Sequence, residues 1–167
     1  MQLVPLNSLR LLSVINKLHN ESCPVHLYIL GIGPMKDELE EIINKDNMSD
    51  YVTLLGYDTN PYKYVAKSDL FVCASFAEGF STAATEALIV GTPVVTVEVS
   101  GMKEMLGENN EYGIVTENSE EALYEGIKKM ITTPGMLEDY AKRAKERGKY
   151  FSTENTVKAV ESMFESL

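Results

Sequence analysis

Short apolar runs and longer amphipathic stretches alternate along this chain, and their order predicts its fold. The apolar runs are rich in Val, Ile, Leu and Phe, which suits strands buried on both faces of a parallel sheet. They lie at residues 25–30, 51–55, 70–74, 94–97 and 113–116. The stretches between them carry apolar residues at helical spacing. The sequence therefore predicts an α/β fold, a Rossmann-like doubly wound parallel sheet with helices on both faces.

Turn and capping residues set the expected helix ends. Asn7 or Ser8 is expected to cap the first helix, and the turn at 31–34 to begin a second that runs to about Asn47. Pro61 is expected at the first position of a short helix. Further helices are predicted at 102–106, from the capping residues 118–121 to about 130, from 133, and from about 152.

The most informative stretch joins the third strand to the fourth through a turn and a helix. The turn covers residues 76–80, and Ser81 or Thr82 can cap the helix that follows. Gly91 is a usual residue just past a helix end, and Pro93 prevents continuation. This order brings the turn to the carboxyl edge of the sheet, where ligands of open α/β sheets bind.

Two carboxylates lie in this stretch, Glu78 in the turn and Glu86 one helical turn after Thr82. Both can face the carboxyl edge, where free N–H groups of a helix start attract anions. We expect such groups from the backbone of Gly79, Phe80, Ser81 and Thr82. The alternative is that the helix dipole alone favours Glu86 and that Glu78 is a solvated loop residue. The spacing by itself does not decide between the two.

Length and composition narrow the class of protein. At 167 residues and 44% hydrophobic content, the chain suits one globular domain. No apolar run approaches the roughly 18 residues of a membrane helix, and the first residues do not have the pattern of a signal peptide. The formal charge of −10 argues against a nucleic-acid surface. It also means that a bound anion requires local positive potential, from a helix start or from basic residues.

The cysteines and acidic residues do not indicate a metal or a resident cofactor. Cys23 and Cys73 stand far apart, without the spacing of a zinc site or a disulfide scaffold. This cysteine usage fits the cytoplasm. The sequence also has no Asp-x-Asp motif that would hold a divalent ion.

A longer set of motifs resembles a known family. The stretch 75–80, followed by Glu86-Ala87-Leu88 and by the Gly-Thr-Pro-Val-Val segment 91–95, resembles the signature of retaining, nucleotide-sugar-dependent glycosyltransferases of the GT-B fold, known as group 1. The family mark is two glutamates separated by seven residues, which Glu78 and Glu86 match. The similarity continues in order and spacing through the segments 30–34, 52–57, 101–104 and 112–115.

This resemblance implies a role for each site residue. Glu78 is expected to contact the donor sugar as the catalytic residue, and Glu86 to hold the ribose hydroxyls of the nucleotide. The resemblance also implies donor contacts from Gly31, Gly33, Gly79, Phe80, Ser81 and Thr82. The donor is expected to be a UDP- or GDP-linked sugar, and GT-B enzymes usually need no metal.

The chain departs from the family pattern in two ways. A GT-B enzyme has two Rossmann-like domains and reacts in the cleft between them, whereas residues 1–167 correspond to the C-terminal, donor-binding domain. That domain normally opens with a strand ending in Gly-Arg, followed by a Lys, and the two bases clamp the diphosphate. The matching start at residues 2–8 has neither base. We therefore expect a fragment without its first strand and without the N-terminal acceptor domain, inactive on its own.

The missing strand would lie in the middle of the sheet, between the strands that contain Tyr28 and Phe71. Its absence leaves strand edges that either close onto each other or pair with another molecule. A homodimer through these edges is therefore predicted.

Three functions compete at this point. The leading one is retaining hexosyl transfer by the full-length protein to an acceptor saccharide or lipid-linked sugar, as in polysaccharide biosynthesis at the inner face of the membrane. The second is a non-catalytic nucleotide-binding or assembly module, which the absent Arg and Lys favour and the retained glutamate pair opposes. The third, sugar-nucleotide epimerase chemistry on the same fold, fits the Glu-Gly-Phe and Gly-Thr-Pro motifs less well.

Overall fold

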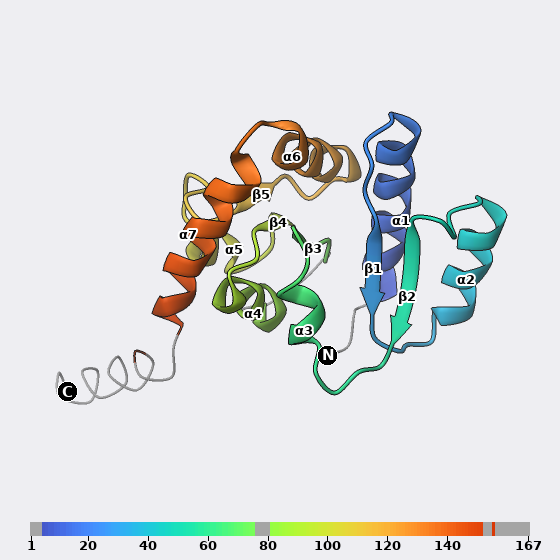
Figure 1. Ribbon diagram of the computed structural model, residues 1–167, viewed down its shortest axis with the longest axis horizontal. Helices are drawn as coiled ribbons and strands as arrows, with labels where there is room; N and C mark the ends of the chain where they lie inside the picture. The colour runs from blue at the N-terminus through green and yellow to red at the C-terminus, as the bar shows by residue number, and fades with distance from the viewer. Residues whose placement is uncertain (1–4, 76–80, 152–154, 156–167) are drawn as a thin grey trace.

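The computed structural model describes residues 5–75, 81–151 and 155. Helices and strands alternate in the order that the sequence predicts (Figure 1). The helices are α1 (Pro5–Asn20), α2 (Lys36–Lys45), α3 (Tyr62–Val65), α4 (Thr82–Val90), α5 (Met102–Leu106), α6 (Glu120–Thr132) and α7 (Met136–Tyr150). The strands are β1 (Leu27–Leu30), β2 (Val52–Gly56), β3 (Phe71–Cys73), β4 (Val94–Val97) and β5 (Ile114–Thr116). The helix predicted from about 152 falls mostly on residues outside this set.

All pairing between the described strands is parallel, and it forms two separate sheets. β1 pairs with β2, from Leu27 opposite Val52 to Leu30 opposite Gly56. β3, β4 and β5 pair in that order. β3 is drawn between β4 and β1 (Figure 1), so the edges of β1 and β3 mark the place where the sequence predicts a missing strand. Among the described strands, these two edges do not pair with each other.

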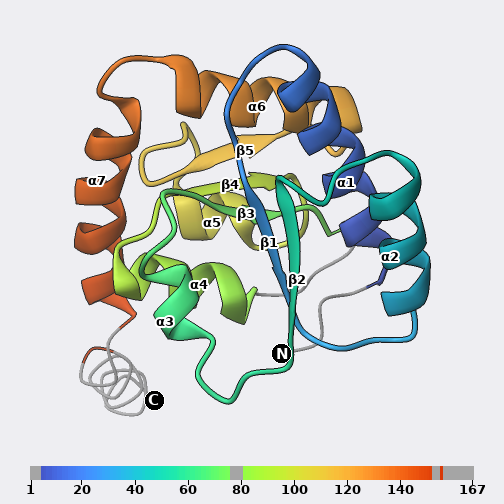
Figure 2. The same ribbon diagram turned by 45° about the vertical axis from the view of Figure 1, so that its right-hand side comes forward.

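β4 is buried along its whole length because helices cover both faces of its sheet. Val95 and Val97 pack in one cluster with side chains of α1 and α6. Val94 packs in a second cluster with side chains of α4, α5 and α7. Successive side chains of a strand point to opposite faces, which explains the division. The larger sheet therefore has the two helical layers of a doubly wound fold (Figure 2).

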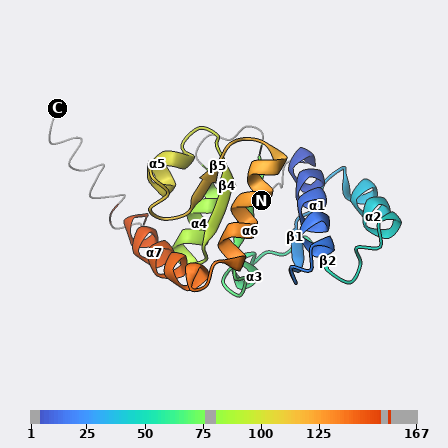
Figure 3. The same cartoon turned by 90° about the horizontal axis from the view of Figure 1, so that it is seen from above.

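Helix α1 joins the two sheets. Its apolar face, which includes Leu12, Ile15 and Leu18, belongs to the same cluster as Ile29 of β1 and Val95 of β4. α1 also lies beside α6, which covers the larger sheet (Figure 3). One core therefore spans both sheets, although no strand pairing among the described residues connects them.

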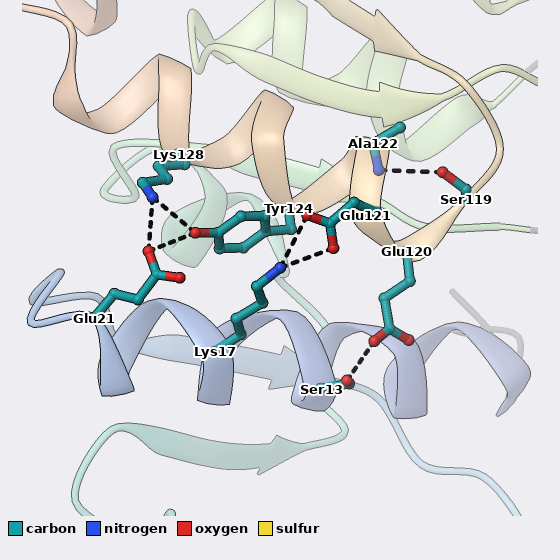
Figure 4. Close-up of polar contacts among 9 residues, drawn as sticks. All are labelled: Ser13, Lys17, Glu21, Ser119, Glu120, Glu121, Ala122, Tyr124 and Lys128. Atoms are coloured by element: carbon teal, nitrogen blue, oxygen red, sulfur yellow. Dashed lines mark hydrogen bonds and ion pairs between the residues drawn. The ribbon is translucent and has the colours of Figure 1, made fainter.

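A row of polar contacts runs along the line where α1 meets α6 (Figure 4). The pairs are Ser13 with Glu120, Lys17 with Glu121, and Glu21 with both Tyr124 and Lys128. The distances between their polar atoms fall between 2.5 and 3.0 Å. Hydrogen bonds from Lys128 and then Tyr124 lower the pKa of Glu21. These contacts fix the relative orientation of two helices whose apolar faces share one core.

Two helix starts differ from the prediction. α1 covers Pro5–Asn20 among the described residues, so Asn7 and Ser8 lie inside the helix and the predicted cap is wrong. α2 begins at Lys36, not in the turn at 31–34, because Gly31 has a φ of 128°, which is far from helical geometry.

Two other boundaries are explained by strand pairing and by capping. β1 begins at Leu27 because that residue is the first one opposite β2. The start of α4 is as predicted, with the Ser81 side-chain oxygen accepting from the N–H of Ala84 at 3.4 Å. Its end is also as predicted, at Gly91 with a φ of 83°.

The helices are moderate in length, and α1 is the longest of those described, at 16 residues. A membrane span needs about 20 mainly apolar residues. Within the described ranges, no helix combines the length and the hydropathy needed to cross a bilayer.

Candidate functional site

A pocket opens beside the carboxyl ends of β1 and β2. The loop after β1, the start of α2, the end of β2 and one side of α1 form its wall. The lining residues include Ser8, Gly31, Ile32, Gly33, Lys36 and Gly56. The enclosed volume is only about 40 Å³, so a ligand the size of a nucleotide would lie mostly at the open mouth.

Backbone geometry explains two of the three glycines that line this pocket, and it does not explain the third. The N–H of Gly31 donates to the carbonyl oxygen of Gly56 at 2.7 Å, which ties the loop after β1 to the end of β2. Gly31 and Gly56 have φ values of 128° and 71°, in the region that favours glycine. Gly33 has no positive φ, and a Cβ added there would meet no described atom within 4 Å. The fold explains Gly31 and Gly56 but leaves the glycine at position 33 without a structural reason.

Ser8 is a pocket residue that the sequence reasoning missed, since the sequence predicted a helix cap there. The residue is 4% exposed, and its hydroxyl has no hydrogen-bond partner among the described residues. Buried hydroxyl groups usually have one. The available signal was a small polar residue on the apolar face of α1, three positions before Leu11 and four before Leu12.

Glu86 lies on α4 and does not line the pocket. Its Oε1 accepts a hydrogen bond from the hydroxyl of Tyr62, the first residue of α3, at 3.1 Å. The hydrogen bond to Glu86, and then the negative charge of Glu86, raise the pKa of this hydroxyl. Tyr62 follows the pocket residue Gly56 by six positions, so one short loop joins the pocket to the tyrosine that holds Glu86.

That loop is folded around Asp58. The carboxylate is 2.6 Å from Nζ of Lys63 and accepts from the N–H of Asn60 at 2.8 Å and from the hydroxyl of Tyr64 at 3.0 Å. The hydrogen bond from Lys63 and then that from Asn60 lower the pKa of Asp58 from the ordinary 3.8 to about 2. Tyr62 and Tyr64, which follow this loop on α3, therefore both donate hydrogen bonds to carboxylates, Tyr62 to Glu86 and Tyr64 to Asp58.

The other predicted site residues fall into two groups. Ser81 is buried as the cap of α4, and Thr82 is exposed in its first turn. Glu78, Gly79 and Phe80 lie outside the described residues, so their expected roles stay predictions. The structure thus brings Gly31 and Gly33 together, and it gives Glu86 a partner from the loop that leads away from them.

Arg10 supplies a positive charge that the sequence reasoning also missed. Its guanidinium is 3.5 Å from the carbonyl oxygen of Ala74, just after β3, and 2.7 Å from Oδ1 of Asn118. The residue is 8% exposed. By contrast Lys103, a basic residue on α5, is paired with Glu98 at 2.6 Å. In the ranges 5–75 and 81–151, no group of three or more His, Cys, Asp or Glu side chains could hold a metal ion.

The family model described as Glycosyl transferases group 1 matches residues 7–147, which include the pocket, α3 and α4. The chain belongs to the group 1 glycosyltransferases. The resemblance seen in the sequence motifs is thereby confirmed.

Two of the curated relatives of this group 1 chain are named for transfer of N-acetylhexosamines. A Campylobacter jejuni protein, N-acetylgalactosamine-N,N'-diacetylbacillosaminyl-diphospho-undecaprenol 4-alpha-N-acetylgalactosaminyltransferase, is 41% identical over 127 residues. The match covers 75% of this chain and 34% of that protein. A poly(ribitol-phosphate) alpha-N-acetylglucosaminyltransferase of Staphylococcus aureus is 27% identical over 144 residues, which are 85% of this chain and 29% of that one.

Solved structures with the same fold include glycosyltransferases bound to UDP. HepE of Anabaena in complex with UDP superposes with a TM-score of 0.84 at 21% identity, over 100% of this chain and 47% of that one. TarM of Staphylococcus aureus, in a complex that contains UDP, superposes with a TM-score of 0.84 at 25% identity, over 98% of this chain and 34% of that one. The Rossmann-like half of a GT-B fold is therefore confirmed for this group 1 chain, which spans between a third and a half of these proteins.

Proposed function

We propose that this group 1 glycosyltransferase domain binds a nucleotide-diphosphate sugar for retaining transfer of its hexosyl group. The observation that carries the proposal is the link from the glycine-lined pocket to Glu86 through the loop 57–61. Gly56 lines the pocket, and Tyr62, directly after this loop, holds Glu86. The carboxyl edge of parallel strands is where open α/β sheets bind ligands, and the proposal places the flat base at the pocket mouth and the ribose hydroxyls at the Glu86 carboxylate.

The base would lie over the pocket mouth, against Gly33 and Ile32. The side of Gly33 that a Cβ would occupy is open among the described residues, and Ile32 is 62% exposed. An exposed apolar side chain at the rim of a pocket gains from a ligand that covers it. The ribose would follow toward Glu86, whose carboxylate accepts hydrogen bonds from a diol.

The diphosphate would lie nearer β3 and the start of α4. Free N–H groups of a helix start carry partial positive charge, and Ser81 and Thr82 form that start. Arg10 adds a full positive charge at the carbonyl of Ala74. These groups would oppose the repulsion of an anion by a chain with a formal charge of −10. Glu78 is proposed to contact the donor sugar, as the family signature implies.

The proposed donor is a UDP-linked N-acetylhexosamine. Support comes from HepE and from the pneumococcal O-GlcNAc transferase GtfA, which are described as complexes with UDP, and from the Campylobacter relative, which is named for transfer of N-acetylgalactosamine. The proposed acceptor is a lipid-linked saccharide held by another domain, because that relative is named for a diphospho-undecaprenol acceptor and is about three times as long as the matched segment.

Calorimetric titration of the full chain with UDP, GDP and ADP tests the leading proposal. UDP is expected to bind most tightly of the three. Glu86→Ala is expected to weaken the binding of UDP about tenfold or more, because a hydrogen bond to a charged group is lost. Glu125→Ala is the matched control, since it removes the same charge from an exposed position on α6. If Glu86→Ala and Glu125→Ala bind UDP as well as the unchanged chain does, the ribose assignment is wrong.

A further inference from the structure

The hydroxyl of Tyr62 is the hydrogen-bond donor that the described residues offer to Glu86. We propose that Tyr62 is a positioning residue for the nucleotide, because it holds Oε1 of Glu86 and leaves Oε2 for the ribose hydroxyls. This inference rests on the proposed function, in which Glu86 accepts from the ribose. It adds a residue of α3 to a site that the family signature describes through the turn after β3 and through α4.

A glutamate has a reason to need such a partner. Its side chain has three rotatable bonds, and fixing them on binding costs conformational entropy. A hydrogen bond to Oε1 in the free protein removes part of that cost beforehand. A carboxylate can accept several hydrogen bonds, so the bond from Tyr62 leaves capacity for the ligand.

The donor comes from a segment that is itself held in place. The hydroxyl of Thr92, after α4, donates to the carbonyl oxygen of Val65 at the end of α3, at 2.8 Å. At the other end of the segment, Asp58 gathers Asn60, Lys63 and Tyr64 into one folded loop. α3 is therefore anchored to the end of the same helix that carries Glu86, and Tyr62 moves little relative to it.

The chemistry of the phenol fits a donor role. Because Glu86 raises the pKa of Tyr62, the hydroxyl keeps its proton at neutral and mildly alkaline pH. The ring is 45% exposed, so Tyr62→Phe removes the hydroxyl with little effect on the core.

The experiment compares two ligands that differ only at the ribose, UDP and 2′,3′-dideoxy-UDP, by calorimetry on the full chain. Tyr62→Phe is expected to weaken the binding of UDP about three- to tenfold and to leave the affinity for dideoxy-UDP unchanged. Tyr150→Phe is the control, because it removes an exposed tyrosine hydroxyl at the end of α7, a helix that carries none of the proposed donor contacts. It is expected to preserve the preference for UDP. In the Glu86→Ala background, Tyr62→Phe is expected to have no further effect on UDP.

The possible results distinguish a failure of this inference from a failure of the proposed function. If Tyr62→Phe changes the affinity for neither ligand, or weakens the binding of both equally, the positioning role is wrong. The proposed donor site still stands in that case if Glu86→Ala loses the preference for UDP over dideoxy-UDP. If the unchanged chain does not bind UDP, or Glu86→Ala keeps the full preference for UDP over dideoxy-UDP, the proposed function fails and the role of Tyr62 fails with it. Thermal unfolding of each variant checks that the fold is retained.

Discussion

At the scale of single residues, glycines with and without a structural reason are easily told apart. Gly148 on α7 packs against the backbone of α4, where an added Cβ would lie 2.3 Å from the carbonyl oxygen of Leu88. A Cβ added at Gly126 on α6 would lie 2.5 Å from Cγ2 of Thr116. A Cβ added at Gly33 would meet no described atom within 4 Å, and Gly33 lines the pocket. A glycine that the fold does not require, at the mouth of a pocket, is a candidate for close approach by a ligand.

Gly33→Ala is therefore expected to keep or slightly raise the free energy of unfolding, by up to about 1 kcal/mol, because alanine restricts the unfolded chain. Gly33→Ala is expected to weaken the binding of UDP at least severalfold, since the new methyl group projects toward the proposed position of the base. Urea unfolding and calorimetry measure the two effects. Gly148→Ala is the contrasting variant and is expected to lose about 1–3 kcal/mol through overpacking of α4 against α7. Unchanged UDP affinity in Gly33→Ala would remove this residue from the proposed site.

The candidate site was predictable where it rests on motifs and unpredictable where it rests on side-chain placement. Gly31 and Gly33 are marked by a glycine-rich turn after an apolar run, and the structure brings them together in the pocket. Arg10 and Ser8 lie within an ordinary helical pattern. Their proximity to β3 and to the pocket depends on how α1 is rotated against the sheets, which local sequence does not specify.

At the scale of elements, the loop from β2 to α3 owes its shape to one carboxylate. Asp58 accepts from Asn60, Lys63 and Tyr64, and this arrangement starts the short helix that carries Tyr62. The sequence predicted a helix start at Pro61, and Pro61 lies directly before α3 with a φ of −63°. The carboxylate that organises the loop was not evident from the spacing.

Asp58 is expected to make stability depend on pH in a defined window. Its pKa is lowered from 3.8 to about 2 in the folded chain, so the unfolded chain binds the proton more tightly. The stabilisation is therefore present above about pH 3.8 and is lost as the pH falls toward 2. Urea midpoints of Asp58→Asn are expected to fall less steeply over this window than those of the unchanged chain. Asp50→Asn, an exposed change before β2, serves as the control, and equal slopes in all three proteins would contradict the prediction.

The contact between α1 and α6 combines a shared apolar core with a polar row, and the two contribute unequally. Leu18 is fully buried in the cluster that spans both sheets, whereas Lys17 and its partner Glu121 are exposed at 43% and 68%. Exposed ion pairs add little to stability because water screens them. The polar row therefore orients the helices more than it holds them together.

Leu18→Ala is accordingly expected to cost about 2–5 kcal/mol, since it leaves a cavity between the two sheets. Lys17→Ala, which removes a neighbouring side chain of the polar row, is expected to lower the free energy of unfolding far less. This smaller loss is expected to decrease further at high salt, because salt screens the ion pair. Urea unfolding at low and high salt measures both. A loss in Lys17→Ala as large as that in Leu18→Ala would mean that the polar row carries the interface.

At the scale of the whole molecule, one of the two buried clusters joins the two sheets. The buried cluster runs from β1 and β2 through α1 to β4, β5 and α6. Neither sheet's inner edge, at β1 or at β3, is paired with the other among the described strands. Unpaired parallel edges expose backbone donors and acceptors that can pair with another chain.

Self-association is therefore expected, and sedimentation velocity measures it as an apparent mass that rises with protein concentration. Tyr28→Lys is the test variant, because Tyr28 is 54% exposed on β1 and a lysine there places like charges opposite each other in a dimer. The variant is expected to shift the equilibrium toward monomer. A mass that stays monomeric at the highest concentration reached would contradict an edge-paired dimer.

The sequence by itself determined the order of strands and helices, the caps of α4 and membership of the group 1 glycosyltransferases. These properties rest on local patterns, namely the apolar period, turn residues and motif spacing. Only the tertiary structure decided the division into two sheets, the pocket position of Ser8, the place of Arg10 beside β3 and the bond from Tyr62 to Glu86. These depend on the packing of α1 and α3 against distant elements, where contacts between residues far apart in sequence fix each side chain.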